Sequence, residues 1–128
     1  MARKPPKPPK PTAAELDLLR VLWPLGSATV KEVHELAQKE KAHMSYATVL
    51  RLMQVMHGKG LLRRDESQRS HVYAPAHARE SLRGGLLKEL IQKAYAGSGK
   101  ELVMAALRGH VSAAERAEIQ AFLEEGEQ

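Results

Sequence analysis

Residues 45–64 read Ser45-Tyr-Ala-Thr-Val-Leu-Arg-Leu-Met-Gln-Val-Met-His-Gly-Lys-Gly-Leu-Leu-Arg-Arg64 and form the most informative stretch of this 128-residue chain. Four of its apolar residues recur at the i, i+3, i+4 and i+7 positions of a helix, namely Val49, Leu52, Met53 and Met56. Ser45 stands where a helix N-cap belongs, and Gly58 with Gly60 supplies the stop. The pattern therefore predicts an amphipathic helix.

The opposite face of this predicted helix carries small and hydrogen-bonding side chains. At about 100° per residue, that face holds Ala47, Arg51 and Gln54. Arg matches guanine O6 and N7, Gln matches adenine N6 and N7, and a small residue lets the helix lie close to the bases. The face therefore suits the reading of a DNA major groove. Taken alone, this segment is equally compatible with an ordinary amphipathic surface helix that does not bind DNA.

The flanking segments favour the DNA-reading alternative. Two helices are predicted upstream, at about residues 12–23 and 29–38, and two short extended segments downstream, at residues 61–65 and 70–74, with a polar turn between them. Three helices followed by a basic hairpin is the order of a winged helix-turn-helix, whose third helix enters the major groove. The predicted DNA-binding residues are Ser45, Tyr46, Ala47, Thr48, Arg51, Gln54, Arg63, Arg64, Arg69 and His71.

The remaining chain is predicted to be helical and to form a dimer. A Ser or Thr followed three residues later by Glu marks four helix starts, at Thr12, Thr29, Ser98 and Ser112. The last three helices cover roughly 50 residues, which is too few to close a good core alone, and a second copy is the simplest partner for their apolar faces. We expect the dimer core to contain Leu86, Leu87, Leu90, Ile91, Ala94, Leu102, Leu107 and Phe122.

The predicted fold class is thus mostly α with a small β-hairpin. Residues 1–11 are expected to be a disordered, basic, proline-rich tail, residues 12–77 a winged-helix DNA-binding domain, and residues 78–128 a helical dimerisation domain. A two-fold dimer also suits a palindromic double-stranded DNA site.

Charge and composition narrow the class of protein. The net charge is +5, and residues 1–80 hold 14 Lys and Arg against 8 Asp and Glu. The excess of basic residues therefore lies in the part of the chain that contains the predicted DNA-binding domain. The absence of cysteine excludes disulfides and thiolate chemistry. Apolar runs are too short for a membrane span or export signal, which predicts a cytoplasmic location.

No catalytic or cofactor motif is present in the sequence. The six histidines are scattered without the spacing of metal ligands. We therefore expect that the protein binds no metal ion, uses no cofactor and is not an enzyme. Two alternatives to a sequence-specific repressor remain, a non-specific architectural DNA-binding protein and a winged-helix protein–protein adaptor.

Several of these stretches together resemble the BlaI/MecI/CopY family of bacterial transcriptional repressors, the penicillinase-repressor family. The resemblance covers about residues 11–124. Its markers are the segment from Pro11 to Trp23, the Ser45-x-x-Thr48-Val49 start of the third helix, Lys59-Gly-Leu-Leu-Arg-Arg64, and Tyr95-Ala-Gly97 followed by Leu102-Val103. The resemblance implies a homodimeric repressor with an N-terminal winged helix. In many members, proteolysis in the dimerisation domain by a membrane-bound metalloprotease sensor releases the DNA.

The sequence departs from the family pattern at two places. The family's third helix usually continues Thr-Val-x-Thr-x-x-x-Arg, whereas here Arg51 replaces the second Thr and Val55 replaces the Arg, so the operator sequence need not be the usual one of the family. The family's scissile junction aligns at about Ala105–Ala106, where its Asn-Phe pair is missing. Copper-responsive relatives carry cysteine ligands, and this chain has none.

Overall fold

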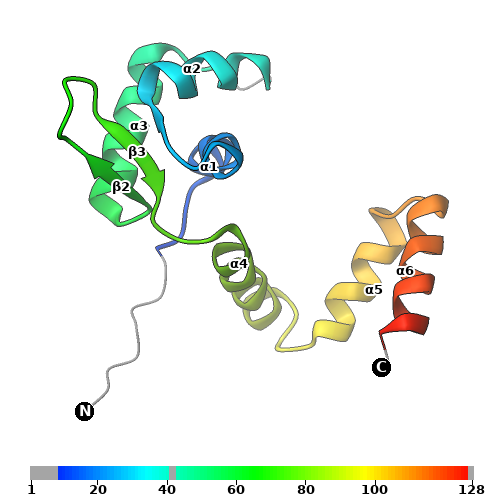
Figure 1. The fold of residues 1–128 in the computed structure, drawn as a ribbon. Coiled ribbons are helices and arrows are strands. Elements are labelled where there is room, and N and C mark those ends of the chain that lie inside the picture. Colours follow the sequence, from blue (N-terminus) through cyan, green and yellow to red (C-terminus); the bar gives the residue numbers. More distant parts are fainter. Residues whose placement is uncertain (1–8, 41–42, 127–128) are drawn as a thin grey trace. The chain divides into compact units, whose positions relative to one another are not determined.

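Three helices, each begun by a hydroxyl side chain, lead into a small sheet in the computed structural model, which describes residues 9–40 and 43–126 (Figure 1). They are α1 (Ala13–Leu25), α2 (Val30–Lys39) and α3 (Tyr46–Lys59). Thr12 and Thr29 form complete capping boxes with Glu15 and Glu32, and Ser45 caps α3. The three predicted helices and their starts are therefore confirmed.

The end of α3 is set by Gly60. The helix continues through Gly58 to Lys59, and Gly60 then adopts a left-handed conformation with φ of +86°, which glycine tolerates best. The Gly60 N–H donates to His57 O at 3.1 Å, and the Leu61 N–H donates to Met56 O at 2.8 Å. These two bonds form a Schellman motif, which turns the chain directly into the next strand.

The sheet has three antiparallel strands in the order β1-β3-β2. Strands β2 (Leu62–Asp65) and β3 (Val72–Pro75) form the predicted hairpin, referred to below as the wing. Strand β1 (Ala28–Thr29) pairs with the other edge of β3, so that Ala28 lies opposite Tyr73. This strand was not predicted, because two residues are too few to show an alternating pattern.

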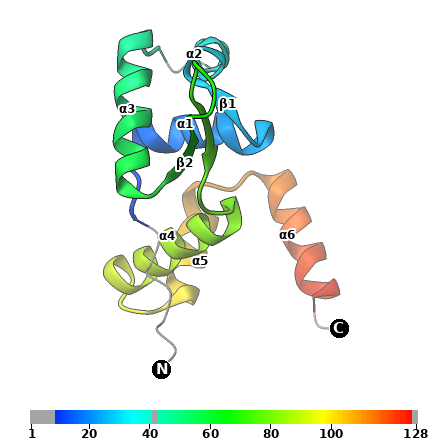
Figure 2. The same ribbon diagram turned by 60° about the vertical axis from the view of Figure 1, so that its left-hand side comes forward.

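One hydrophobic core holds these elements together. Helix α1 packs against α2, α3 and β3 (Figure 2). The core of buried apolar residues contains Leu18, Leu19, Val21, Leu22, Ala28, Val30, Val33, Ala37, Val49, Met53, Met56, Leu61, Leu62, Tyr73 and Leu82. Its last member, Leu82, belongs to α4 (Arg79–Ala94), so the start of that helix is anchored to the same core.

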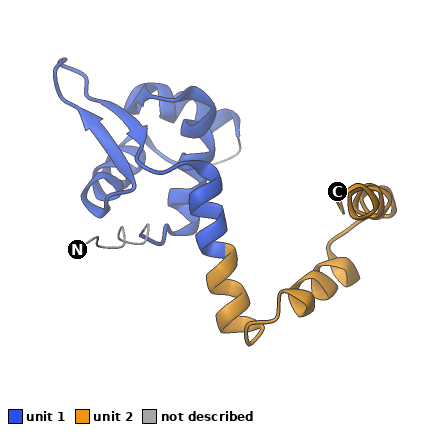
Figure 3. Cartoon of the chain, turned by 60° about the horizontal axis from the view of Figure 1, so that its bottom comes forward, with its two compact units in different colours: residues 1–86 blue, residues 87–128 orange. Residues whose placement is uncertain are grey.

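The chain divides into two compact units, residues 1–86 and residues 87–128, with the division inside α4 (Figure 3). The second unit also contains α5 (Gly99–Gly109) and α6 (Ala113–Glu125), whose described residues include none that is buried. Ser112 completes a capping box with Glu115, and Ser98 caps α5 by accepting from the Glu101 N–H. The predicted helical segment after the wing is therefore confirmed, while its boundary at residue 78 stays a prediction.

The predicted fold class, mostly α with a small antiparallel sheet, is confirmed. The predicted basic tail of residues 1–11 lies outside the described residues except for residues 9–11. Within the described part of the chain, no helix is long and apolar enough to cross a membrane.

Candidate DNA-binding site

Helix α3 has one buried face and one exposed face, as the sequence predicted. Val49, Met53 and Met56 are fully buried in the core. Ala47, Arg51 and Gln54 lie exposed on the opposite face. The core therefore fixes the rotation of the helix and leaves the hydrogen-bonding side chains outward.

The start of α3 is held by its own side chains. The Thr48 N–H donates to Ser45 Oγ at 3.1 Å, and the Ser45 hydroxyl donates to Thr48 Oγ1 at 3.0 Å. No acidic residue lies in the first turn. Because helix N-termini carry a partial positive charge, this end of α3 favours an anion.

Tyr46 occupies the first position of α3 and contacts α2. Its ring lies edge-on to the His34 ring, with the centroids 5.7 Å apart, while the residue remains 48% exposed. An aromatic pair of this geometry restrains the side chain. Tyr46 therefore lies at the surface, restrained on one side by His34 and open to a partner molecule on the other.

The four basic residues predicted on the wing fall into two pairs. Arg63 and Arg69 are exposed. Arg64 is largely buried, pairs with Glu66 at 3.2 Å, and has a buried Nε without a hydrogen-bond partner in the described residues. His71 Nε2 lies 3.9 Å from the same carboxylate oxygen of Glu66. Arg63 and Arg69 are thus the two of the four that are exposed and that do not contact Glu66.

A hollow of about 290 Å³ lies between α3 and the wing. It brings together four predicted residues, Tyr46 and Gln54 from α3 and Arg69 and His71 from the wing. The other predicted DNA-binding residues do not line it. Its full lining is Thr29, Val30, Lys31, Tyr46, Leu50, Gln54, Arg69, Ser70, His71 and Tyr73.

Lys31 is a basic residue at this hollow that the sequence analysis did not select. It is exposed in the first turn of α2. The unpredicted strand β1 places the start of α2 beside the wing, because β1 pairs with β3 and α2 follows β1 directly. The sequence signal that could have indicated Lys31 was its position two residues after the Thr29 cap, on the helix that precedes α3.

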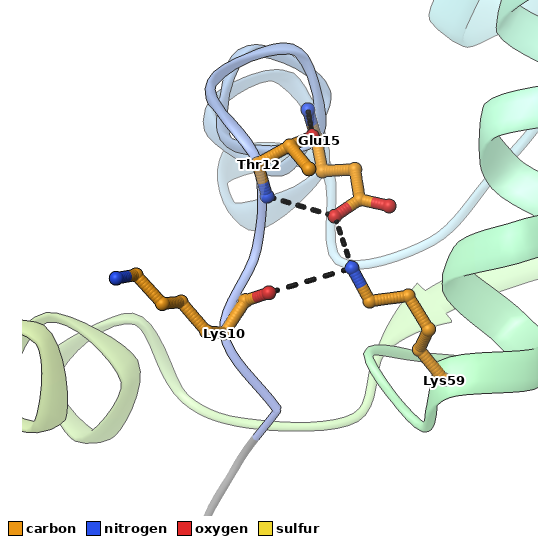
Figure 4. Close-up of polar contacts among 4 residues, drawn as sticks. All are labelled: Lys10, Thr12, Glu15 and Lys59. Atoms are coloured by element: carbon orange, nitrogen blue, oxygen red, sulfur yellow. Dashed lines mark hydrogen bonds and ion pairs between the residues drawn. The ribbon is translucent and has the colours of Figure 1, made fainter.

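An ion pair fastens the far end of α3 to the start of α1 (Figure 4). Lys59 Nζ lies 2.7 Å from Glu15 Oε1 and donates to Lys10 O at 3.4 Å. The Thr12 N–H donates to the same Glu15 oxygen at 2.8 Å. Glu15 is only 2% exposed, so this contact lies at the edge of the core.

The surroundings of Glu15 keep its carboxyl group ionised. Burial raises its pKa, but the hydrogen bonds from Lys59 and Thr12, together with the positive charge of Lys59, outweigh burial and lower the pKa below its ordinary value. The pair therefore joins α1 to α3 with a charge-assisted hydrogen bond and helps to hold α3 on the core.

The residues predicted to form a dimer core are distributed unevenly over the two units. Leu86 belongs to the first unit. In the second unit, Leu87 and Leu90 are about half exposed and Phe122 is 70% exposed. Ala94 is exposed, while Ile91, Leu102 and Leu107 are half-buried. The structure adds five large, exposed, non-aromatic apolar residues that were not predicted to lie in the dimer core, namely Leu25 on α1, Val55 on α3, Val103 and Met104 on α5, and Leu123 on α6.

The predicted cleavage junction lies within regular secondary structure. Ala105 and Ala106 are half-buried residues of α5. Among the described residues, no group of three or more His, Cys, Asp or Glu side chains is arranged to hold a metal ion.

A family model described as penicillinase repressor matches residues 11–125, which is nearly the whole chain. The chain belongs to the penicillinase repressor family. The resemblance given by the sequence motifs is therefore confirmed, and the chain is a member of a family of transcriptional repressors.

Two similar proteins are the transcriptional regulators BlaI of Mycobacterium tuberculosis strains CDC 1551 / Oshkosh and ATCC 25618 / H37Rv, each 35% identical over 66 residues. These matches cover 52% of this chain and 47% of each relative, so the chain spans about half the length of the curated relatives it matches. The solution structure of monomeric Bacillus licheniformis BlaI in complex with the blaP half-operator matches with a TM-score of 0.51 and 27% identity. It covers 59% of this chain and 90% of that chain, which supports the winged-helix fold.

Proposed function

We propose that this family member is a sequence-specific transcriptional repressor that binds a palindromic double-stranded DNA operator as a homodimer. The observation that carries the proposal is the exposed face of α3, where Ala47, Arg51 and Gln54 stand opposite a fully buried apolar face. The similar Bacillus licheniformis BlaI structure is a complex with a half-operator. The chain therefore acts by binding rather than by catalysis.

In the proposed complex, α3 lies in the major groove. Ala47 permits a close approach, Arg51 donates to a guanine, and Gln54 pairs with an adenine. The N-terminus of α3, with Ser45 and Thr48, faces a phosphate or the adjacent base edges, and Tyr46 lies beside it. These contacts select sequence, because base edges differ in the major groove.

The wing contributes affinity rather than sequence preference. Arg63 and Arg69 are exposed and contact phosphates, which releases counterions from the DNA. Arg64 and His71 both lie against the carboxylate of Glu66, so they can contact a phosphate only after the Glu66 side chain has moved away from them. Lys31 adds a further positive charge beside the hollow.

The apolar residues of the second unit support the dimer. Phe122, at 70% exposure, and Leu123, at 57%, are adjacent exposed apolar residues of α6, and apolar residues that gather at a surface mark interaction sites. A second copy covers such residues by symmetry, and the two-fold axis pairs two reading heads with two half-sites. Binding of the second half-site then becomes intramolecular, which raises the affinity for the complete operator.

Release of the operator follows either from binding of an unidentified ligand or partner or, as in many members of the family, from cleavage, here between Ala105 and Ala106 by a membrane-bound metalloprotease sensor. Such a cut separates α6 and Leu107 from the rest of the second unit. A helical domain this small depends on that apolar area. The dimer is therefore weakened, and each separated monomer can bind only one half-site. Because both residues lie in a helix, α5 has to unwind locally before a protease can cut it.

The test is selection of binding sites from a random pool of duplex DNA by the full chain. The proposal predicts enrichment of a palindrome whose half-sites lie about one helical turn apart, roughly 10 base pairs. A non-specific architectural protein enriches no sequence and binds selected and scrambled DNA equally. A protein–protein adaptor shows no salt-dependent DNA binding at all.

A further inference from the structure

A second hollow, of about 460 Å³, lies between α1 and the first half of α4. It shares no lining residue with the hollow beside α3. Its apolar wall consists of Leu16, Trp23, Pro24 and Leu86, and its polar wall of Arg20, Arg79 and Arg83. All seven residues belong to the first compact unit. The volume falls within the range of small-molecule sites, about 300–1,000 Å³.

The walls of this hollow are fixed by contacts already present in the chain. Leu82 of α4 is 3% exposed in the core. The Trp23 indole Nε1 donates to His77 O at 3.3 Å, just before α4 begins. Helix α4 is thereby held against α1 on both sides of its first turn. The two helices that form the walls are therefore in place before a ligand enters, whereas the exposed Arg83 side chain is ordered when the ligand binds.

The charge of the polar wall favours an anion. Arg20 pairs with Asp17, and Arg79 pairs with Glu80 at 3.1 Å. Within the described residues, Arg83 makes no hydrogen bond or ion pair, although Glu80 acts on it through its charge. The positive charges of three guanidinium groups are therefore offset by the negative charges of two carboxylates. The net charge of +1 lies beside the apolar wall of the hollow.

We propose that this hollow binds a small amphipathic carboxylate. Its aliphatic or aromatic body lies against Leu16, Trp23 and Leu86, and Arg83 holds its carboxylate through paired N–H donors. Nucleic acid is a poor occupant, because four of the seven lining residues are apolar. A second copy of the chain is also less suitable, because the more exposed apolar residues cluster in the second unit, with Phe122 the most exposed of them.

The full chain offers a direct reporter, because Trp23 is its only tryptophan. We would titrate the chain with cyclohexanecarboxylate and with cyclohexanecarboxamide, which has nearly the same shape but no charge, and follow the Trp23 emission. The carboxylate should produce a saturable change with a Kd in roughly the millimolar range, as expected for a ligand of its size. The amide should bind about tenfold more weakly, because it lacks the charge-assisted hydrogen bonds.

A pair of variants separates the proposed site from general binding. Arg83→Gln should weaken carboxylate binding about tenfold, whereas Lys88→Gln, also on α4 but outside the lining, should not change it. Arg83 is exposed, so its replacement leaves the core intact.

Three results of the titration would overturn the proposal. They are no saturable response of Trp23, an equal response to the carboxylate and the amide, or an unchanged response in Arg83→Gln. Trp23 emission that depends on protein concentration without any probe would assign the hollow to a second copy instead. The titration contains no DNA, so its failure and a failure of the proposed repressor function are distinguishable.

Discussion

Replacing Lys59 by methionine removes the ammonium group from the ion pair with Glu15 and keeps most of the aliphatic side chain. The lost hydrogen bond is 2.7 Å long and ends on a carboxylate that is 2% exposed. Hydrogen bonds to charged groups contribute about 1.5–3 kcal/mol. The Lys59 side chain is 33% exposed, so water partly replaces it, and the Thr12 N–H still donates to Glu15. We therefore expect Lys59→Met to lower the free energy of unfolding by about 2 kcal/mol.

The pH dependence of this loss has a definite sign. The pKa of Glu15 is lowered in the folded state, so its contribution is complete above its ordinary pKa, near 4.5, and disappears as the pH falls through the lower folded value. The difference between the natural chain and Lys59→Met should therefore be full at about pH 7 and should shrink at about pH 3.5.

Urea unfolding followed by Trp23 emission measures this difference in the first unit, to which Trp23 belongs. Lys39→Met is the matched control, because Lys39 also lies in the last turn of a helix and thus has the same favourable position in the helix dipole. Equal losses in the two variants, or a loss in Lys59→Met that is the same at both pH values, would refute the reasoning.

Three further predictions concern the wing, the dimer and release. Arg63→Ala should lower the slope of log K against log salt by about 1 per half-site with sequence preference intact, as anisotropy at several salt concentrations measures, and a changed preference would contradict a phosphate contact. Phe122→Glu should convert the dimer to monomers in sedimentation at micromolar concentration, while Ala121→Glu on the same helix should not; a dimer in both variants would show that Phe122 is outside the interface. Co-expression with a membrane metalloprotease sensor under inducing conditions should give fragments that end at Ala105 and begin at Ala106 by mass spectrometry, and an intact chain would end that proposal.

The helices and the wing could be predicted because their signals are local. Ser45 and Thr29 cap helices within three residues of sequence, and Val49, Met53 and Met56 repeat at helical spacing. The exposed face of α3 follows from that spacing alone, so Arg51 and Gln54 could be selected before the structure was known.

What the sequence could not show depends on residues far apart in the chain. Lys59 and Glu15 are 44 positions apart, and only the packing of α1 against α3 brings them together. Lys31 lies at the hollow beside the wing because β1 pairs with β3, and β1 is too short to show a sequence pattern. Glu66 is close to Arg64 and His71 in the sequence, but its contact with both depends on the conformation of the hairpin turn, which the residue pattern does not give.

The exposure of Phe122 could not be predicted either, for a different reason. A stripe of apolar residues predicts burial but does not say whether the same chain or another copy supplies the cover. The structure shows Phe122 at 70% exposure in the single chain, which no periodicity reveals.

Binding of the full chain to its selected operator and to a scrambled duplex, with and without Arg51→Ala, tests the central proposal most directly. At one salt concentration, the natural chain should prefer the operator by at least about 10³-fold. Arg51→Ala should lose about 1–3 kcal/mol on the operator, relax the preference at one base pair per half-site, and bind the scrambled duplex as before. Equal weakening on both duplexes would contradict the assignment of Arg51, and with it the proposal that α3 reads the bases.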